Sequence, residues 1–456
     1  MKTYDVIVVG SGAGAIILDE ASSKGLKVAM VDKGPLIGGT CLNWGCIPSK
    51  MLIYTADRIV EIKEAKKLGI EAEVKNIDFH SVMERMRKSR QDSQAHIRQA
   101  LKESENLDFY EGEGYFVGDR LLEVNGEKLK GERIFIASGS RPFIPPIKGS
   151  ENVDYLTNES VLELKKSPDS LIIIGGGYIA VEFGHFFGAM GTDVTILEMA
   201  DRLVLFEELE ISELLKSALS KRMKVYTNAL VEEVKESESG VAVVTKNTNT
   251  GKRKEFAAQR IMIAVGRSSN ADILKVENTG VETDKRGFIK VNEYLETNQK
   301  DIFAIGDANG QQMFRHMANR EAEIVAQNAF YGARIKVDYS AVPHAVYSYP
   351  QIASVGLTEA KAREDYDILV GRMQFFNIAK GKAMMEKRGF AKAIVEKDSS
   401  RILGFHIVGP YAPELIQEVV NSMTSGGGMD ELEQGIHIHP ALSELVQYTL
   451  NSLEES

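Results

Sequence analysis

Cys41 and Cys46 are the two cysteines of this 456-residue chain. Two thiols are too few for a disulfide framework or a four-cysteine zinc site. They form either a redox-active pair or two unreactive thiols, because free cysteine is also a common small core residue. Their spacing places them at the expected start of a helix, where Pro48 is tolerated in the first turn and backbone amides favour a thiolate.

Two glycine-rich turns each follow an apolar strand and lead into a helix. The strands are Tyr4–Val9 and Ser170–Ile174. In such a turn the first glycine permits a sharp bend, the second lets backbone amides approach a pyrophosphate, and a third small residue lets the helix pack on the strand. These positions are Gly10, Gly12 and Ala15 in the first turn and Gly175, Gly177 and Ala180 in the second. The duplication predicts two nucleotide-binding sheets, each with an anion at the positive end of a helix.

An acidic residue closes each of these two units. Asp32 follows the strand Lys27–Val31, and Glu198 follows the strand Asp193–Leu197. We interpret both as acceptors for ribose hydroxyl groups, which is the role of an acid at this distance from the glycine turn. A solvated acid at the end of a strand is the alternative at each position.

The elements between the two units must bring the cysteines to the first glycine turn. Helices are expected over about 49–68 and 79–103, followed by hairpin-like strands Leu107–Val117 and Leu121–Val124. The segment 133–142 then returns the chain to the first sheet.

Near residue 338 the two nucleotide-binding units end and a different order of helices and strands begins. The segment 261–267 closes the second sheet, and no further glycine turn follows it. Beyond residue 338 we expect two helices and strands at 345–347, 367–375, 390–396 and 402–408. This alternation indicates a separate α+β domain.

The composition excludes several classes of partner. The net charge of −10 argues against nucleic acid and anionic membranes, which do not attract an acidic surface. No apolar run has the length of a membrane span, and Met1 to Thr3 lead directly into a strand without a recognisable targeting segment. These features predict a cytoplasmic protein, in which thiols are normally reduced.

The stretch from Gly38 to Lys50, GGTCLNWGCIPSK, resembles the FAD-dependent pyridine nucleotide-disulfide oxidoreductases, which include dihydrolipoamide dehydrogenases and glutathione reductases. The resemblance covers essentially the whole chain. It implies that Cys41 exchanges with the substrate and that Cys46 contacts the flavin. The segment His437 to Glu444, HIHPALSE, is similar to the family's active-site segment, which reaches into the partner subunit.

The resemblance also implies roles for individual residues. His439 would be the catalytic acid and base, and Glu444 would orient it. Lys50 and Glu182 match a pair beside the flavin, although two unrelated surface charges are the alternative. Tyr178 resembles an aromatic gate over the nicotinamide pocket, and core packing is the other reading. The other expected cofactor-binding residues are Lys33, Gly39, Thr40, Ser138, Gly139, Gly266, Arg267, Gly306 and Asp307.

The implied fold is α/β, with two Rossmann-like dinucleotide-binding domains and a C-terminal α+β dimerisation domain. FAD would bind residues 1–150 and 268–338, NAD would bind residues 151–267, and residues 339–456 would form the interface of a homodimer. No metal is expected.

The substrate is expected to be a small dithiol or disulfide. Dihydrolipoamide is the leading interpretation, and the lipoyl group could stand on a carrier protein. The cysteine motif, the stretch Gly404 to Glu418 and the acid Glu198 look like dihydrolipoamide dehydrogenases. Leu18–Glu20 and His316–Asn319 look more like mycothione reductases, which are the alternative. A non-catalytic electron-carrier flavoprotein is less favoured, because the cysteine pair argues against it.

Glu20 bears on the choice of substrate. It lies where glutathione reductases carry an arginine that binds the anionic peptide. If Glu20 lines the disulfide channel, its charge disfavours oxidised glutathione. The alternative is that Asp19 and Glu20 are both solvated.

Overall fold

The computed structural model describes residues 1–238 and 240–455, and its first sheet is centred on β1 (Lys2–Val9). This strand pairs in parallel with β2 (Val28–Asp32) on one side and β6 (Glu127–Ile136) on the other. Its apolar residues are buried, because both faces of a parallel sheet are covered. The other strands of this sheet are β3 (Leu107–Glu111), β4 (Tyr115–Gly118), β5 (Leu121–Val124) and β17 (Ile302–Ala304).

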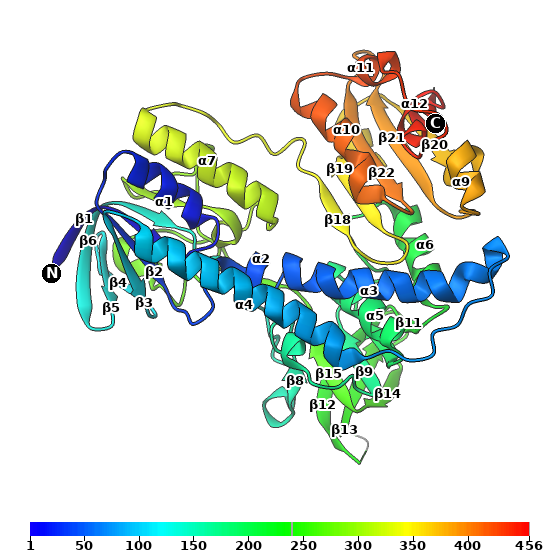
Figure 1. Cartoon of the computed structure of the whole chain (residues 1–456), viewed down its shortest axis with the longest axis horizontal. Helices are drawn as coiled ribbons and strands as arrows, with labels where there is room; N and C mark the ends of the chain where they lie inside the picture. The colour runs from blue at the N-terminus through cyan, green and yellow to red at the C-terminus, as the bar shows by residue number, and fades with distance from the viewer. Residues whose placement is uncertain (239, 456) are drawn as a thin grey trace.

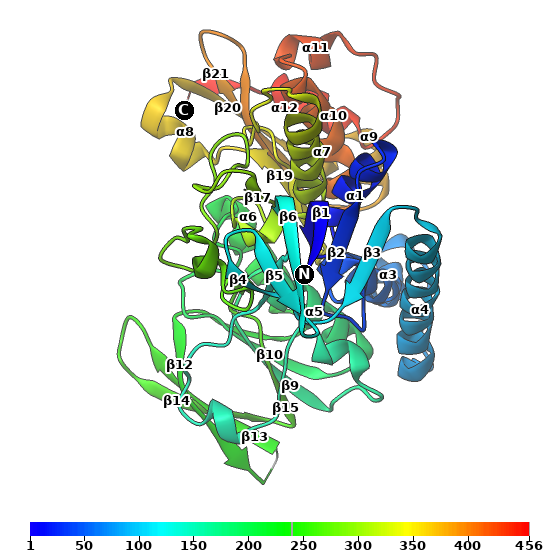
Figure 2. The same cartoon turned by 90° about the vertical axis from the view of Figure 1, so that its left-hand side faces the viewer.

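The first sheet is assembled from two separate parts of the chain. β17 follows the second sheet in the sequence, yet it pairs in parallel with β6. The helices α1 (Gly14–Ser23) and α7 (Arg315–Tyr331) lie side by side next to this sheet (Figures 1 and 2). The chain therefore leaves the first sheet, builds the second and returns.

The expected strand Leu107–Val117 is wrong as a single element. β3 adds to the parallel edge beside β2, whereas β4 pairs antiparallel with β5. Gly112 lies between β3 and β4, and a Cβ atom there would approach Asn125 Oδ1 to 2.3 Å. The chain turns within the polar stretch Glu111–Gly114, which separates the two apolar segments.

The second sheet repeats the arrangement of the first. Its central strand β9 (Ser170–Ile174) leads through the second glycine turn into α5 (Tyr178–Met190) and then β10 (Asp193–Leu197), close to the expected bounds. The remaining strands of the sheet are β11 (Lys224–Tyr226), β15 (Arg260–Ile263) and β8 (Tyr155–Leu156). An antiparallel sheet of β12 (Ala229–Ser237), β13 (Gly240–Asn247) and β14 (Arg253–Ala258) precedes β15 in the sequence, and α6 (Leu209–Leu219) precedes β11.

Only the first part of the segment 261–267 belongs to the second sheet, which that segment was expected to close. β15 ends at Ile263, and Arg267 begins β16 (Arg267–Ser269). β16 pairs antiparallel with β7 (Ser140–Pro142), which follows β6. The two crossings between the sheets are thus hydrogen-bonded to each other.

Cys41 and Cys46 lie on consecutive helices. Cys41 is in α2 (Gly39–Asn43), and Cys46 begins α3 (Cys46–Glu64), which is extended by a 3-10 turn over Ala65–Leu68. The expected helix thus starts three residues earlier than predicted. In Figure 1, α3 passes between α5 of the second sheet and the C-terminal sheet, and α4 (Phe79–Glu103) packs against it.

The C-terminal region is the expected α+β unit with more elements than predicted. β19 (Ile352–Gly356) was missed, and it pairs with β22 inside the sheet. The other strands are β18 (His344–Val346), β20 (Ile368–Gln374), β21 (Phe390–Glu396), β22 (Ile402–Val408) and β23 (Glu454–Glu455). The helices are α8 (Glu359–Asp365), α9 (Ala379–Ala383), α10 (Ala412–Thr424), α11 (Met429–Gln434) and α12 (Glu444–Leu450), instead of the two predicted.

Candidate active site

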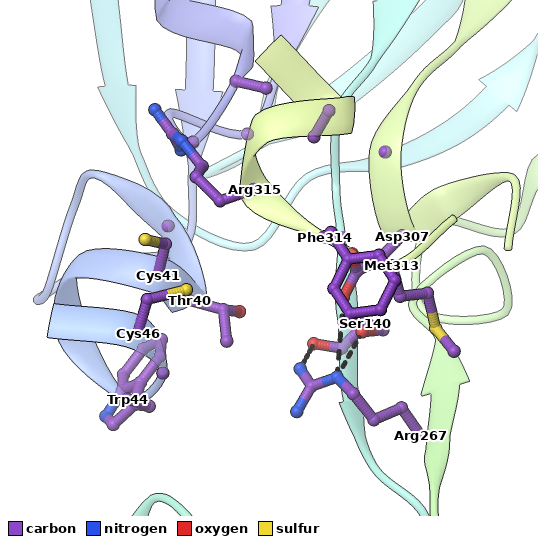
Figure 3. A pocket seen from close by; sticks show the side chains of 18 of the residues that line it. Thr40, Cys41, Trp44, Cys46, Ser140, Arg267, Asp307, Met313, Phe314 and Arg315 are labelled. Atoms are coloured by element: carbon purple, nitrogen blue, oxygen red, sulfur yellow. Dashed lines mark hydrogen bonds and ion pairs between the residues drawn. The ribbon is translucent and has the colours of Figure 1, made fainter. Parts of the chain in front are cut away.

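A cavity of about 680 Å³ lies between the first glycine turn, the cysteine-bearing helices and the start of α7. Figure 3 shows Cys41 and Cys46 on one side of this cavity and Ser140 and Arg267 on the other. The expected site residues that line it are Gly10, Gly12, Asp32, Lys33, Gly39, Thr40, Cys41, Cys46, Lys50, Ser138, Gly139, Tyr178, Glu182, Arg267, Gly306 and Asp307. The lining does not include Ala15, Gly175, Gly177, Ala180, Glu198, Gly266, His439 or Glu444.

The first glycine of each turn is required by a close backbone approach. Gly10 has φ +103°, and a Cβ atom there would lie 2.2 Å from the carbonyl oxygen of Ala137. Gly175 has φ +112°, and a Cβ atom there would lie 2.4 Å from the carbonyl oxygen of Ala264. The two turns therefore have the same construction, as their sequence similarity predicts.

The acids at the strand ends lie against their glycine turns. Asp32 Oδ2 accepts hydrogen bonds from the backbone N–H of Ser11 at 2.8 Å and from its hydroxyl at 2.5 Å. Glu198 Oε1 accepts the N–H of Ala200 at 2.7 Å, and the Glu198 carboxylate lies next to Gly176. Both carboxylates stand beside the turn, so the reading of two unrelated solvated acids is not favoured.

The two thiols differ strongly in acidity. The hydrogen bond from Cys41 lowers the pKa of Cys46 to about 6, and the nearby charge of Lys50 acts in the same direction. The pKa of Cys41 is raised, first by its hydrogen bond to Cys46 and then by burial. In the reduced pair the negative charge therefore resides on Cys46 and the proton on Cys41.

Lys50 and Glu182 form the expected ion pair. Lys50 Nζ lies 2.8 Å and 3.0 Å from the two carboxylate oxygens of Glu182, which is buried. Glu182 Oε1 also accepts the N–H of Tyr347 at 3.0 Å, and Lys50 Nζ lies 4.6 Å from the centre of the Tyr347 ring. Because each charge has its partner, the pair can remain ionised although it is largely removed from water.

Tyr178 begins α5 and lines the same cavity. Burial raises the pKa of its hydroxyl to about 12, so the phenol stays neutral. The side chain also packs against the core beneath the second sheet. Its position agrees with both interpretations of the sequence, the aromatic gate and core packing.

Ser140 joins two residues that were predicted separately. Its hydroxyl donates to Asp307 Oδ2 at 2.5 Å and accepts from Arg267 Nε at 2.6 Å (Figure 3). Arg267 Nη2 also donates to the Ser140 carbonyl oxygen at 2.8 Å. No sequence pattern indicated Ser140, because its two partners come from distant segments, Arg267 from β16 and Asp307 from the turn after β17.

His439 and Glu444 are paired but lie away from the cysteines. His439 Nδ1 is 2.8 Å from Glu444 Oε1, and the hydrogen bond lowers the pKa of the Glu444 carboxyl. The imidazole is 68% exposed, whereas Glu444 is buried. His437 Nε2 lies 3.2 Å from Glu418 Oε2, so this second histidine braces the segment.

Arg315 and Asn319 are cavity residues that the sequence analysis missed. They lie on α7, where Asn319 ends the stretch His316–Asn319 that resembles mycothione reductases, but neither residue was expected at the site. Glu20, by contrast, does not line the cavity, and its Oε2 accepts a hydrogen bond from Tyr331 at 3.0 Å. The argument that Glu20 repels anionic disulfides therefore has no support from this arrangement.

Residues 1–238 and 240–455 lack both a metal-binding cluster and a membrane-spanning helix. This part of the chain contains no group of three or more histidine, cysteine or acidic side chains arranged to hold a metal ion. It also contains no helix with the length and apolar character needed to cross a bilayer.

Two family models cover most of the chain. Residues 4–322 match the model described as pyridine nucleotide-disulphide oxidoreductase. Residues 342–450 match the dimerisation domain of the same family.

Curated relatives with different substrates are similar over nearly the full length. A mycothione reductase of Mycobacterium tuberculosis is 36% identical, with 99% of this chain and 100% of the relative covered. A dihydrolipoyl dehydrogenase of Geobacillus stearothermophilus is 35% identical, with 97% and 94% covered. A mercuric reductase of Lysinibacillus sphaericus is 33% identical, with 97% and 81% covered.

A solved structure of the same architecture is the HOCl-induced flavoprotein disulfide reductase RclA from Escherichia coli, determined as a Cu(II) complex. It superposes with a TM-score of 0.88 at 29% identity, and 99% of each chain is covered. The expected fold class is thereby confirmed.

Proposed function

The chain belongs to the pyridine nucleotide-disulphide oxidoreductase family, whose members use FAD and NAD(P)H, and from this premise we propose how its residues carry electrons to or from a substrate. Electrons pass between NAD(H), FAD, the Cys41–Cys46 pair and a small dithiol or disulfide. The observation that carries this proposal is the location of both cysteines in one cavity with the first glycine turn and the Lys50–Glu182 pair.

The cavity has the features that FAD requires. Gly10 and Gly12 leave space for a pyrophosphate beside the start of α1, where the first-turn amides have no side-chain cap. The Ser138 hydroxyl is buried without a hydrogen-bond partner among the described residues, and it lines the same cavity. Asp32 and Asp307 would hold the ribose and ribityl hydroxyls. When bound, FAD supplies the two-electron chemistry that links a nicotinamide to a thiol pair.

The second glycine turn supplies the nicotinamide nucleotide site. Gly175 and Gly177 precede α5, and Glu198 stands beside them to accept ribose hydroxyls. Tyr178 begins α5 and lines the cavity, which supports its proposed role as a gate over the nicotinamide.

The cysteines divide the exchange reaction between them. Cys46 holds the negative charge of the reduced pair, next to Lys50. Cys41 is the thiol that forms and breaks the mixed disulfide with the substrate. It holds a proton at neutral pH, so its attack requires a base.

His439 is the proposed base and acid. Glu444 accepts a hydrogen bond from Nδ1–H, which leaves Nε2 free to take a proton from a thiol and to return it to a leaving thiolate. Because the imidazole is exposed and outside the cavity of its own chain, we assign it to the site of a partner subunit. The protein is therefore proposed to act as a homodimer.

Dihydrolipoamide is the first substrate to test. The reaction converts dihydrolipoamide and NAD⁺ to lipoamide, NADH and a proton. Purified holoenzyme should form NADH from these reactants, and Cys41→Ser should abolish the activity. Absence of turnover in both directions would exclude lipoamide.

A low-molecular-weight disulfide reductase is the second candidate. Here NADH, a proton and a disulfide give NAD⁺ and two thiols. The observation that favours it is the pair Arg315 and Asn319, which adds polar groups to the cavity next to Cys41. A panel of disulfides assayed beside lipoamide discriminates the two candidates.

We propose that the protein works in the cytoplasm, whichever of the two substrates it uses.

A further inference from the structure

Arg315 is a cavity cation without an ionic partner. Its side chain extends from the first residue of α7 toward the part of the cavity that holds Cys41 (Figure 3). The other arginines that line the cavity are paired, Arg141 with Asp272 and Arg267 with Asp307. Among the residues that the structure describes, no oxygen atom accepts a hydrogen bond from the Arg315 guanidinium. Its N–H groups are therefore available to a ligand.

The guanidinium lies on the cysteine side of the first glycine turn. Arg315 Nη1 is 3.7 Å from the position that a Cβ atom on Gly12 would occupy, and the Cα atom of Gly39 is 3.5 Å from the same position. Gly39 begins α2, the helix of Cys41. The Arg315 charge also acts to lower the pKa of Cys41, against the larger effects of Cys46 and burial.

Asn319 adds a second polar group on the same face of α7. It follows Arg315 by four residues, so the two side chains are neighbours on the helix surface, and both line the cavity. The Asn319 Oδ1 atom is buried and has no hydrogen-bond partner among the described residues. A buried amide oxygen without a donor is unfavourable, which indicates a missing ligand group.

We propose that Arg315 and Asn319 form a subsite for a carboxylate of the substrate disulfide next to Cys41. The guanidinium and the Asn319 amide supply donors for the carboxylate, and Asn319 Oδ1 accepts an adjacent N–H. A disulfide derived from an N-substituted cysteine offers both groups close to its sulfur. This inference rests on the proposed disulfide exchange at Cys41, and it favours an anionic low-molecular-weight disulfide over neutral lipoamide.

The alternative occupant of the subsite is a phosphate of the cofactor, because Gly12 belongs to the turn that would bind the pyrophosphate. The glycine turn and the start of α1 already offer amides to that group. The substrate is favoured because Arg315 lies on the same side of the cavity as Cys41 (Figure 3) and its charge acts on the Cys41 thiol.

The first test compares alkylation of Cys41 by two reagents in the reduced holoenzyme. Iodoacetate carries a carboxylate, whereas iodoacetamide is neutral. The rate with iodoacetate divided by the rate with iodoacetamide at Cys41 therefore measures the attraction of an anion, independently of the fraction of thiolate. Peptide mapping assigns each rate to Cys41 or Cys46. Arg315→Gln should lower the ratio at Cys41 at least about fivefold, the effect expected for one charge at a partly solvated site. Arg315→Lys should retain most of it.

Arg320→Gln is the matched control, since Arg320 is on the same helix, is exposed, pairs with Glu323 and does not line the cavity. Its alkylation ratio should equal that of the wild type. An unchanged ratio in Arg315→Gln, or an equal fall in Arg320→Gln, would overturn the proposal.

The second test uses dithiodipropionate and its neutral diamide, two disulfides that differ in charge. The wild type should reduce the dianion with the higher kcat/KM, and Arg315→Gln should remove this preference by raising KM for the dianion alone. Asn319→Leu alone should weaken the preference without removing it. FAD affinity, measured by fluorescence titration of the apoprotein, should be the same in wild type and variants.

The results separate this inference from the proposed function. If the wild type reduces both disulfides equally well, the subsite is refuted while the reductase activity stands. If Arg315→Gln loses FAD affinity and treats both disulfides alike, Arg315 belongs to the cofactor site. If no disulfide or dithiol turns over although FAD is bound, the proposed function itself fails, whereas the alkylation ratio still decides on the subsite.

Discussion

At the scale of single residues, the two cysteines differ because their neighbours differ. Lys50 stands one helical turn after Cys46, and its charge favours the Cys46 thiolate. Cys41 donates a hydrogen bond to that thiolate, and burial raises the pKa of Cys41 further. The same side-chain chemistry therefore gives one stabilised thiolate and one protonated thiol.

Removing the Cys41 donor should raise the pKa of Cys46. In Cys41→Ala it should rise from about 6 toward the ordinary value of about 8.5, whereas Cys41→Ser retains a hydroxyl donor and should show a smaller rise. Difference ultraviolet absorbance of the thiolate, recorded against pH in reduced protein, measures this change. A pKa that stays near 6 in Cys41→Ala would contradict the assigned hydrogen bond.

The Cys46 thiolate also links stability to pH in the reduced protein. Its folded pKa lies below the unfolded value, so its stabilising contribution is complete above about pH 8.5. This contribution is lost as the pH falls to about 6. The Tm of the reduced wild type should decrease over this window by more than that of Cys46→Ala.

Glu198 should select NADH over NADPH. A carboxylate close to a 2′-phosphate repels it by up to about 4 kcal/mol at an effective dielectric constant near 20, and hydration reduces this value. Even about 1 kcal/mol gives a roughly fivefold preference in kcat/KM. Glu198→Arg should weaken or reverse the preference in steady-state assays, and wild-type efficiency that is equal with NADPH would count against this role.

At the scale of elements, two polar links join α3 to α5. Lys50 pairs with Glu182 near the cysteines, and two turns further along α3 the Asp57 carboxylate lies 2.9 Å from His185 Nε2. His185 Nδ1 accepts a hydrogen bond from Arg222 at 2.8 Å, so the Nε2 proton points to Asp57. The second link holds the cysteine helix against the second nucleotide-binding sheet.

Replacing His185 should loosen this contact between helices. His185→Phe leaves Asp57 without its buried donor, at a cost of about 1.5–3 kcal/mol for a hydrogen bond to a charged group. His185→Gln is the control, because its amide can keep one of the two bonds. Calorimetry should give a lower Tm for His185→Phe than for His185→Gln.

The pH dependence of stability provides a second measurement at His185. Burial lowers its pKa, so below about pH 6.5 the unfolded chain binds a proton that the folded chain does not. Wild-type stability should therefore fall as the pH drops through this window. His185→Phe should lack this part of the decrease, and an identical pH profile in both proteins would show that His185 is not buried neutral.

At the scale of the whole molecule, the role proposed for the exposed His439 requires a site that two chains share. The C-terminal unit matches a dimerisation domain, and its His439–Glu444 pair lies outside the cavity of its own chain. A C2 interface is the common arrangement in which a segment of each subunit completes the site of the other.

Subunit mixing tests this arrangement. His439→Ala alone should lose about a hundredfold to ten-thousandfold in turnover, and Cys41→Ser alone should be inactive. Mixed after reversible dissociation, half of the dimers should be hybrids with one intact site, which restores about a quarter of wild-type activity. A mixture as inactive as its components, with hybrids demonstrated by mass spectrometry, would place His439 in its own chain's site.

Much of the fold was predictable because its signals are local. β9, α4, β21 and β22 have the expected bounds, since strong apolar periodicity and flanking turns define each of them. Leu107–Val117 failed as a single strand because the turn signal of Gly112 and Gly114, between two apolar segments, was not used to divide it. β19 was missed because its short apolar segment gains its partners only from β18 and β22.

The sequence by itself determined the chemistry of the site. The spacing of Cys41 and Cys46, the two glycine turns and the HIHP segment are contiguous patterns, so their residue types and order were enough to predict a flavin disulfide oxidoreductase. The tertiary structure alone decided which distant side chains meet. Ser140 joins Arg267 to Asp307, Glu20 turns to Tyr331, and Arg315 enters the cavity unpaired. Such contacts depend on how the sheets and helices pack, because residues far apart in the chain leave no local pattern of their proximity.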